Sequence, residues 1–163
     1  AELARLCAPY ARVCILGESM GATAALRFAR HATGSVVALV PQIDVRDFGA
    51  SYAGRADFSD ARKVRLRDAI QHACTATAAQ VVLHVGQDPP DLRQLSYLDE
   101  GIDGLRVVKH DLAGHALGAG LKAKGLLRKV VLGDLLGHTY CLPAATTLTE
   151  PDPCASPVEC IAK

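Results

Sequence analysis

The segment from Val13 to Ala22 constrains the fold of this chain more than any other stretch. Four apolar residues, Val-Cys-Ile-Leu, run directly into the pentapeptide Gly-Glu-Ser-Met-Gly, and a helix-forming sequence follows as far as residue 30. This order predicts a strand, a sharp turn and a helix, with the hydroxyl of Ser19 held out above the end of a sheet. Gly17 and Gly21 are expected to supply permissive backbone dihedrals and to let the helix approach the strand closely.

The rest of the chain alternates short apolar runs with helix-like segments. We expect strands at residues 12–16, 35–40, 80–85 and 105–110, and helices at 1–10, 22–31, 59–74, 91–98 and 121–136. In the helix at 59–74, Val64, Ile70 and Ala73 are expected to share the buried side. Strands that alternate with helices predict an α/β fold with a mostly parallel sheet and helices on both faces.

The length of 163 residues suits a single domain with a sizeable core. We assign residues 1–137 to this domain and expect a long loop at residues 42–57. From residue 138 to residue 163 the composition changes to Pro, Thr, Ala and Cys without any period. This composition predicts a tail that is extended or covered by a partner.

Charge and hydropathy exclude several classes of partner. The net charge is +1 with interspersed signs, which argues against nucleic acid, and no apolar run is long enough to span a bilayer. No secretory signal is visible in this chain, and its first residue is Ala1 rather than Met, as in a processed product or a fragment. The localisation is left open.

The six cysteines form no Cys-x-x-Cys pair, so we predict no zinc site. Three of them lie in apolar or helical surroundings and are predicted to be small buried side chains: Cys7, Cys14 and Cys74. The other three fall in the tail, where a disulfide among them is an open alternative: Cys141, Cys154 and Cys160.

Three reactive residue types come just after predicted strands. Ser19, Asp88 and His115 follow the first, third and fourth strands, and the carboxyl ends of parallel strands meet at one edge of a sheet. A serine hydroxyl becomes nucleophilic when an imidazole takes its proton, and a carboxylate holds that imidazole in the correct tautomer. The sequence therefore predicts a site at this edge.

Alternatives exist for each of these residues. Ser19 could instead cap a helix in an ordinary glycine turn. The same turn could meet a phosphate at the helix N-terminus, although it lacks the glycine spacing of a dinucleotide loop and the Lys of a P-loop. Asp91 competes with Asp88 as the acid, although its place before Leu-Arg-Gln favours a helix cap. His110 competes with His115, which we prefer because Gly114 before it gives the imidazole room to reach Ser19.

The order serine, acid, histidine resembles the α/β-hydrolase superfamily over residues 12–136. The matching pieces are the pentapeptide around Ser19, the strand and loop at 81–88, and the pair Gly-His at 114–115. The resemblance implies Ser19 as the nucleophile, His115 as the general base and Asp88 as the orienting acid. It also implies that the backbone N–H of Met20 contributes to an oxyanion hole.

The resemblance covers only the C-terminal half of that fold. The complete sheet of the superfamily has about eight strands, and a loop after an early strand supplies a second oxyanion donor. The strand at residues 12–16 is therefore expected to be an unpaired apolar edge, which natural proteins avoid. A missing N-terminal half or a partner protein is expected to cover it.

Two functions follow from these observations. The first is a serine hydrolase that cleaves a small-molecule ester, thioester or similar acyl bond through a triad of Ser19, Asp88 and His115. The second is a non-catalytic structural or accessory subunit of a larger complex, built on a degenerate hydrolase fold. Neither reading implies a metal or an organic cofactor. The substrate would depend on the missing half and on the loop at 42–57.

Overall fold

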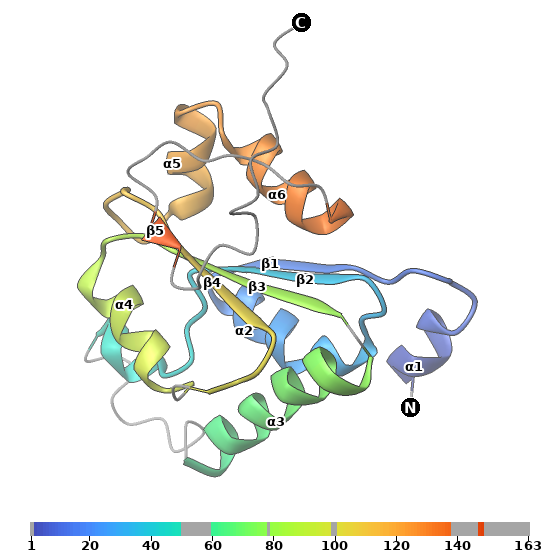
Figure 1. Cartoon of the computed structure of the whole chain (residues 1–163). Coiled ribbons are helices and arrows are strands. Elements are labelled where there is room, and N and C mark those ends of the chain that lie inside the picture. Colours follow the sequence, from blue (N-terminus) through green and yellow to red (C-terminus); the bar gives the residue numbers. More distant parts are fainter. Residues whose placement is uncertain (1, 50–59, 78, 99–100, 138–146, 149–163) are drawn as a thin grey trace, which may run out of the picture.

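A computed structural model describes residues 2–49, 60–77, 79–98, 101–137 and 147–148 of the chain (Figure 1). A sheet lies at its centre, with its strands in sequence order: β1 (Ile15–Glu18), β2 (Ser35–Leu39), β3 (Gln80–Val85), β4 (Leu105–Lys109) and β5 (Thr147–Leu148). The first four strands are parallel, and only the two-residue β5 is antiparallel to its neighbour. The predicted α/β fold with a mostly parallel sheet is confirmed.

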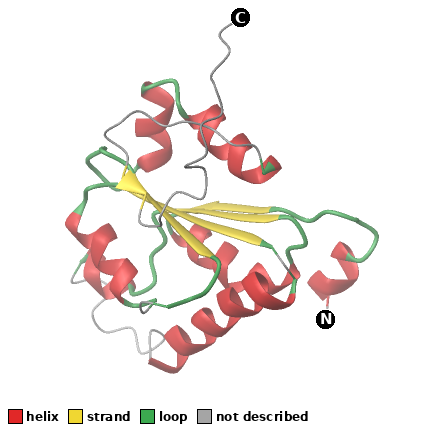
Figure 2. Ribbon diagram, in the orientation of Figure 1, coloured by secondary structure: helices red, strands yellow, loops and turns green. Residues whose placement is uncertain are grey.

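Helices cover both faces of this sheet (Figure 2). The helices are α1 (Glu2–Cys7), α2 (Met20–Arg27), α3 (Asp60–Ala76), α4 (Pro89–Ser96), α5 (Leu117–Ala123) and α6 (Leu127–Leu136), with 3-10 turns η1 (Ala29–His31) and η2 (Val45–Phe48). Helices α2, α3 and α4 lie on one side of the sheet, and α5 and α6 lie on the other (Figure 1). Each side has its own apolar cluster, because β2 and β3 are buried on both faces.

The strand β1 forms one edge of the sheet. Among the described residues it pairs only with β2, from Ile15 opposite Val36 to Glu18 opposite Leu39. Leu16 on this edge is 50% exposed. The parallel register brings the carboxyl ends of β1, β2, β3 and β4 to one edge, where the loops that carry the predicted site begin.

The boundaries of several elements differ from the prediction. The strand expected at 12–16 lies at Ile15–Glu18, and the helix after it begins at Met20 and ends at Arg27 before the turn η1. The helix expected at 121–136 is two helices, because Gly125 takes a positive φ of 70° between them. The strand at 80–85 is as predicted.

Burial also corrects two expectations. Val64 is 48% exposed, whereas Ile70 and Ala73 of the same helix are buried as predicted. None of the three cysteines expected to be buried is so: Cys14, which directly precedes β1, is exposed, and Cys7 and Cys74 are half-buried. The tail cysteines, Ser59 and the loop from residue 50 onward lie outside the described residues, as does most of the 138–163 tail.

Within the part of the chain that the structure describes, no helix is both long and apolar enough to cross a bilayer.

Candidate active site

Ser19 occupies the sharp turn between β1 and α2, as its sequence predicts. Its φ of 58° and ψ of −124° lie outside the regions that L-residues favour. Such a conformation costs on the order of 1–3 kcal/mol and persists where the surroundings impose it. Here the Ser19 N–H donates to the Leu39 carbonyl at 2.9 Å, and the Ser19 carbonyl accepts from the Ala22 N–H at 3.0 Å. These bonds hold the hydroxyl above the edge of the sheet.

The roles predicted for the two glycines of the pentapeptide are confirmed only in part. Neither has a positive φ, so the unusual dihedrals of the turn belong to Ser19 itself. A Cβ atom on Gly17 would lie 2.2 Å from the carbonyl oxygen of Gly21, whereas a Cβ atom on Gly21 would meet nothing within 4 Å. Gly17 is therefore required for the close approach of strand and helix, and Gly21 faces open space.

His115 reaches Ser19 from the loop between β4 and α5. Its Nε2 lies 2.7 Å from the Ser19 hydroxyl oxygen, and its Nδ1 lies 2.6 Å from Oδ1 of Asp91. An ionised carboxylate can only accept a hydrogen bond. The protonated Nδ1 therefore donates a hydrogen bond to Asp91, and Nε2 accepts one from the serine hydroxyl. The chain Asp91–His115–Ser19 has the connectivity of a general-base relay.

The acid in this relay is Asp91, not the predicted Asp88. Helix α4 begins at Pro89, with Asp88 at the N-cap position and Asp91 in the first turn. Proline is favoured in a first turn, because its missing N–H has no partner there in any case. The helix therefore begins earlier than the expected cap at Asp91, and this turns the Asp91 side chain toward His115, while the Asp88 side chain makes no capping hydrogen bond.

The Asp91 carboxylate is buried beside His115 and has few other polar contacts. The Asp91 side chain is fully buried, and Oδ2 has no hydrogen-bond partner among the described residues. Burial raises the pKa of Asp91, the hydrogen bond from His115 acts in the opposite direction, and the nearby charge of Asp88 raises it further. The one side-chain hydrogen bond to the Asp91 carboxylate within the described part of the chain is therefore the bond from the His115 N–H.

Three further side chains surround the relay, and the sequence analysis did not single them out. Gln42 follows β2, and its Nε2 lies 3.4 Å from Nε2 of His115. The ring of Phe48 packs against the imidazole with centroids 5.0 Å apart. The carboxylate of Glu18 accepts from the Gly118 N–H at 2.7 Å.

These contacts have different consequences. The bond from Gly118 to Glu18 ties the start of α5, just after His115, to the residue before Ser19. A Cβ atom at position 118 would lie 3.0 Å from the carboxylate oxygens, so the glycine makes room for this bond. Gln42 was detectable in principle, because it follows a strand at the same edge. The Glu18 contact joins residues 100 positions apart, which no local pattern reveals.

A second strained residue lies beside the first. Val40, at the carboxyl end of β2, has a φ of 45°, which is an outlier for a β-branched residue. Its N–H donates to the His84 carbonyl at 2.7 Å. Ser19 and Val40 are the only described non-glycine residues with a positive φ, and both lie at the edge that carries the relay. Strain of this kind concentrates at functional sites.

The alternative base, His110, belongs to a different cluster. Its Nε2 lies 2.9 Å from Nδ1 of His84, and His84 Nε2 lies 2.7 Å from Asp134, which also pairs with Arg106. His84, His110 and Asp134 are all buried. Burial, followed by the neighbouring His84, lowers the pKa of His110 to about 4. This cluster lies inside the protein, away from Ser19. No group of three or more His, Cys, Asp or Glu side chains among the described residues is arranged to hold a metal ion.

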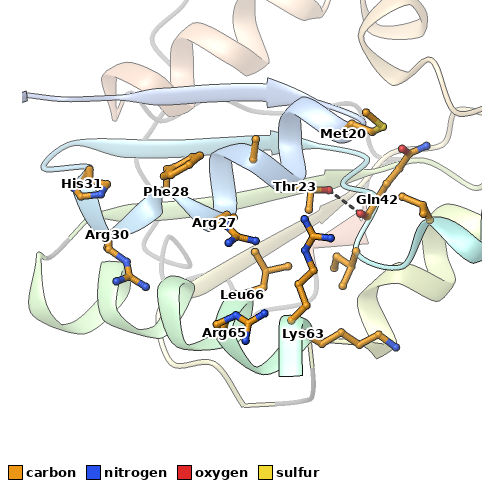
Figure 3. A pocket seen from close by; sticks show the side chains of 14 residues that line it. Met20, Thr23, Arg27, Phe28, Arg30, His31, Gln42, Lys63, Arg65 and Leu66 are labelled. Atoms are coloured by element: carbon orange, nitrogen blue, oxygen red, sulfur yellow. Dashed lines mark hydrogen bonds between the residues drawn. The ribbon is translucent and has the colours of Figure 1, made fainter. Parts of the chain in front are cut away.

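A cavity of about 450 Å³ opens next to the relay, between α2 and η1 on one side and α3 on the other (Figure 3). Met20, which follows the nucleophile, and Gln42, which contacts His115, both line it. The Thr23 hydroxyl, which also lines the cavity, donates to the Gln42 carbonyl at 2.8 Å (Figure 3). This volume is in the range of sites for small molecules.

Searches against protein-family models, curated proteins and solved structures found no match to this chain. The site is therefore interpreted from its own geometry.

Proposed function

We propose that this protein is a serine hydrolase that cleaves an ester or thioester through an acyl-Ser19 intermediate. The observation that carries the proposal is the continuous hydrogen-bonded chain from Asp91 through His115 to the Ser19 hydroxyl. Asp91 lies in the first turn of the helix after β3, His115 in the loop after β4 and Ser19 in the turn after β1, at the edge where parallel α/β sheets carry their chemistry.

The relay supplies the proton transfers that acyl transfer needs. The Ser19 oxygen attacks the acyl carbon as His115 Nε2 takes the hydroxyl proton, and the imidazolium then gives this proton to the departing alcohol or thiol. A water molecule next attacks the acyl-serine, with His115 again accepting the proton, which returns to the Ser19 oxygen as the carboxylic acid leaves. Asp91 holds the imidazole in the required tautomer and stabilises the imidazolium.

We assign two donors to the stabilisation of the oxyanion. The Met20 N–H belongs to the first turn of α2, where backbone N–H groups have no partner within the helix. The side-chain amide of Gln42 flanks the same imidazole nitrogen as Ser19, and we assign it the role of the second donor. One such donor contributes about 3 kcal/mol to the transition state. In the α/β-hydrolase superfamily the second donor comes from a loop after an early strand, which is not among the residues that the structure describes. Gln42 takes the place of that donor in our assignment.

The arrangement of the sheet supports a relationship to the C-terminal half of the α/β-hydrolase fold. Four parallel strands lie side by side in sequence order, and the nucleophile, acid and base follow the first, third and fourth of them. This support is an analogy at the level of the fold, and the activity itself is argued from the relay.

Labelling with a fluorophosphonate tests the proposal directly, because the probe reacts with an activated serine. We expect one adduct per chain, located at Ser19 by peptide mapping and lost in Ser19→Ala. The matched control Ser96→Ala removes an exposed serine of α4 and should retain the adduct. Absence of an adduct on folded protein, or an adduct that survives Ser19→Ala, would reject the enzyme.

The open edge of β1 favours the second candidate, an accessory subunit that pairs with another chain. Its observation is the half-exposed Leu16 on a strand with one described neighbour. Hydrogen exchange tests this edge: amides of β1 should exchange much faster than those of β2 in the isolated protein. Equal protection of the two strands would contradict an open edge.

A further inference from the structure

We propose that the cavity beside Ser19 binds a phosphate-bearing part of the substrate, so that the enzyme acts on acyl esters or thioesters of a phosphorylated carrier. This inference rests on the proposed function for the reaction, but the binding of phosphate can be tested without it.

The charges that line the cavity carry the inference. Among the described residues, no carboxylate lines the cavity. Five cationic side chains line it: Arg27, Arg30, Arg62, Lys63 and Arg65. Lys63 is engaged by Asp44 at 2.9 Å and lies over the ring of Tyr97. Arg27, Arg30 and Arg65 form no ion pair with any residue that the structure describes.

These arginines come from opposite walls of the cavity. Figure 3 shows Arg27 and Arg30 extending from α2 and the turn after it, and Arg65 extending from α3. Arg27 and Arg30 are three residues apart, as are Arg62 and Arg65, so each wall presents a pair of cations on one side. Arg27, Arg30 and Arg65 are exposed, so water and salt screen their mutual repulsion, and an anion bound between them would turn it into attraction.

The helix dipoles act differently on the cations of the two walls. Arg62 and Lys63 lie in the first turn of α3, where the helix dipole disfavours positive charge. The dipole of α2 favours Arg27 in its last turn, but it does not explain cations on the wall that faces it. Guanidinium groups bind phosphate through paired, charge-assisted hydrogen bonds, and three of them match the charge of a diphosphate.

The distance between the nucleophile and the arginines defines how far the phosphate of the substrate lies from its acyl carbon. Met20 and Gln42 place the reacting carbonyl at one end of the cavity. Arg27 follows Met20 by seven residues of α2, which is about 10 Å along a helix axis. The phosphate group is thus expected roughly 10 Å or more from the acyl carbon. Thr23 and Ala24, which lie between Met20 and Arg27 in α2, line the stretch between the two ends.

Binding of inorganic pyrophosphate to Ser19→Ala, measured by calorimetry in phosphate-free buffer, tests the site without any reaction. The triple variant Arg27→Gln/Arg30→Gln/Arg65→Gln should bind at least about 10-fold more weakly. A matched triple variant, Lys122→Gln/Lys124→Gln/Arg128→Gln, removes the same charge from exposed positions of the other face and should bind normally. No pyrophosphate binding, or equal losses in both triple variants, would overturn the inference.

Two further measurements test the stability of the triple Arg variant and the preference of the enzyme for a phosphorylated substrate. The triple Arg variant should melt within a few degrees of the parent, because the three side chains are exposed; a weaker binding that merely reflects unfolding would contradict the assignment to the arginines. With active enzyme, acetyl coenzyme A should have a kcat/KM about 100-fold above that of S-acetyl-N-acetylcysteamine, its phosphate-free counterpart.

Fluorophosphonate labelling and pyrophosphate binding can fail independently, so they distinguish a failure of the proposed hydrolase from a failure of the proposed phosphate site. Pyrophosphate binding that depends on the arginines would stand even if Ser19 takes no fluorophosphonate adduct. Conversely, a labelled Ser19 with no preference for the phosphorylated thioester would reject only the substrate class. Selectivity for p-nitrophenyl hydrogen sebacate, whose free carboxylate can extend about 10 Å from the acyl carbon, over p-nitrophenyl decanoate, without pyrophosphate binding, would assign the cations to a carboxylate and overturn the phosphate.

Discussion

The protein contains two histidine–aspartate pairs of nearly the same geometry and opposite surroundings. His115 Nδ1 lies 2.6 Å from Asp91, and His84 Nε2 lies 2.7 Å from Asp134. The side chain of His115 is 31% exposed and its other nitrogen faces the Ser19 hydroxyl. The side chain of His84 is fully buried, and its other nitrogen faces His110.

The comparison shows that a short bond between histidine and aspartate does not by itself define a catalytic site. In the His115 pair the second imidazole nitrogen is available to exchange a proton with a hydroxyl at the edge of the sheet. In the His84 pair both nitrogens are taken by buried partners, and Arg106 balances the charge of Asp134. The first arrangement suits catalysis, and the second cross-links β3, β4 and α6.

The largest expected effect distinguishes Asp91 from Asp88. Asp91→Asn should lower the rate of ester cleavage about 10³–10⁴-fold, because His115 would lose the acceptor that fixes its tautomer. Asp88→Asn should change the rate less than about 3-fold, because Asp88 acts on the relay only through its charge. Steady-state kinetics on an activated ester measure both. A greater loss of rate in Asp88→Asn than in Asp91→Asn would identify Asp88, the residue that the sequence favoured, as the acid.

The next effect concerns the stability of the buried pair. Asp134→Ala should lower the free energy of unfolding by about 3 kcal/mol, because it leaves the charge of Arg106 and the buried ring of His84 without this partner. Urea denaturation measures the change, and Asp111→Ala at an exposed position is the control. The folded variant should still be labelled at Ser19. Loss of labelling at full stability would make the buried cluster part of the active site.

The buried pair also predicts a dependence of stability on pH. The pKa of His110 is lowered to about 4, so below its ordinary value of 6.5 the unfolded chain binds a proton that the folded protein does not. The free energy of unfolding should therefore fall by about 3 kcal/mol as the pH drops from 6.5 to 4. Denaturation across this range should show a slope that His110→Gln removes and the exposed His72→Gln retains.

A second group titrates in a separate window. Arg46 and then Lys63 hold the pKa of Asp44 below its usual value, against the effect of burial. Its contribution to stability is present above the ordinary aspartate pKa of about 4 and is lost at lower pH. A slope between pH 6.5 and 4 that persists in His110→Gln would contradict the assignment to His110.

The smallest of these effects concerns the surroundings of the exposed pair. Gln42→Ala should lower kcat about 100-fold with the extent of fluorophosphonate labelling unchanged, because it removes the second oxyanion donor and leaves Ser19 and His115 in contact. Gln94→Ala alters a buried glutamine that bonds Asp44 and Asp47 and should affect stability instead. An unchanged kcat in Gln42→Ala would leave Met20 as the only assigned donor.

Much of this architecture could be predicted from local pattern. The apolar run of β3 and the turn at Ser19 are specified by neighbouring residues, so the order of strands and the edge that carries the site followed from them. The helix breaks were less accessible, because Gly125 can be accommodated within a helix or can end one. The exposure of Val64 depends on which side of α3 meets the sheet, and its periodicity alone did not decide this.

By itself the sequence determined an alternating α/β chain with a serine at a strand–helix corner and a histidine after a later strand, because these features depend on residues close together in the chain. Only the tertiary structure decided that Asp91 rather than Asp88 meets His115, that His84 and His110 are sealed inside, and that arginines of α2 and α3 share one cavity. Each of these is a distance between segments tens of residues apart. Such distances are set by where helices begin and how they pack on the sheet, which no local pattern encodes.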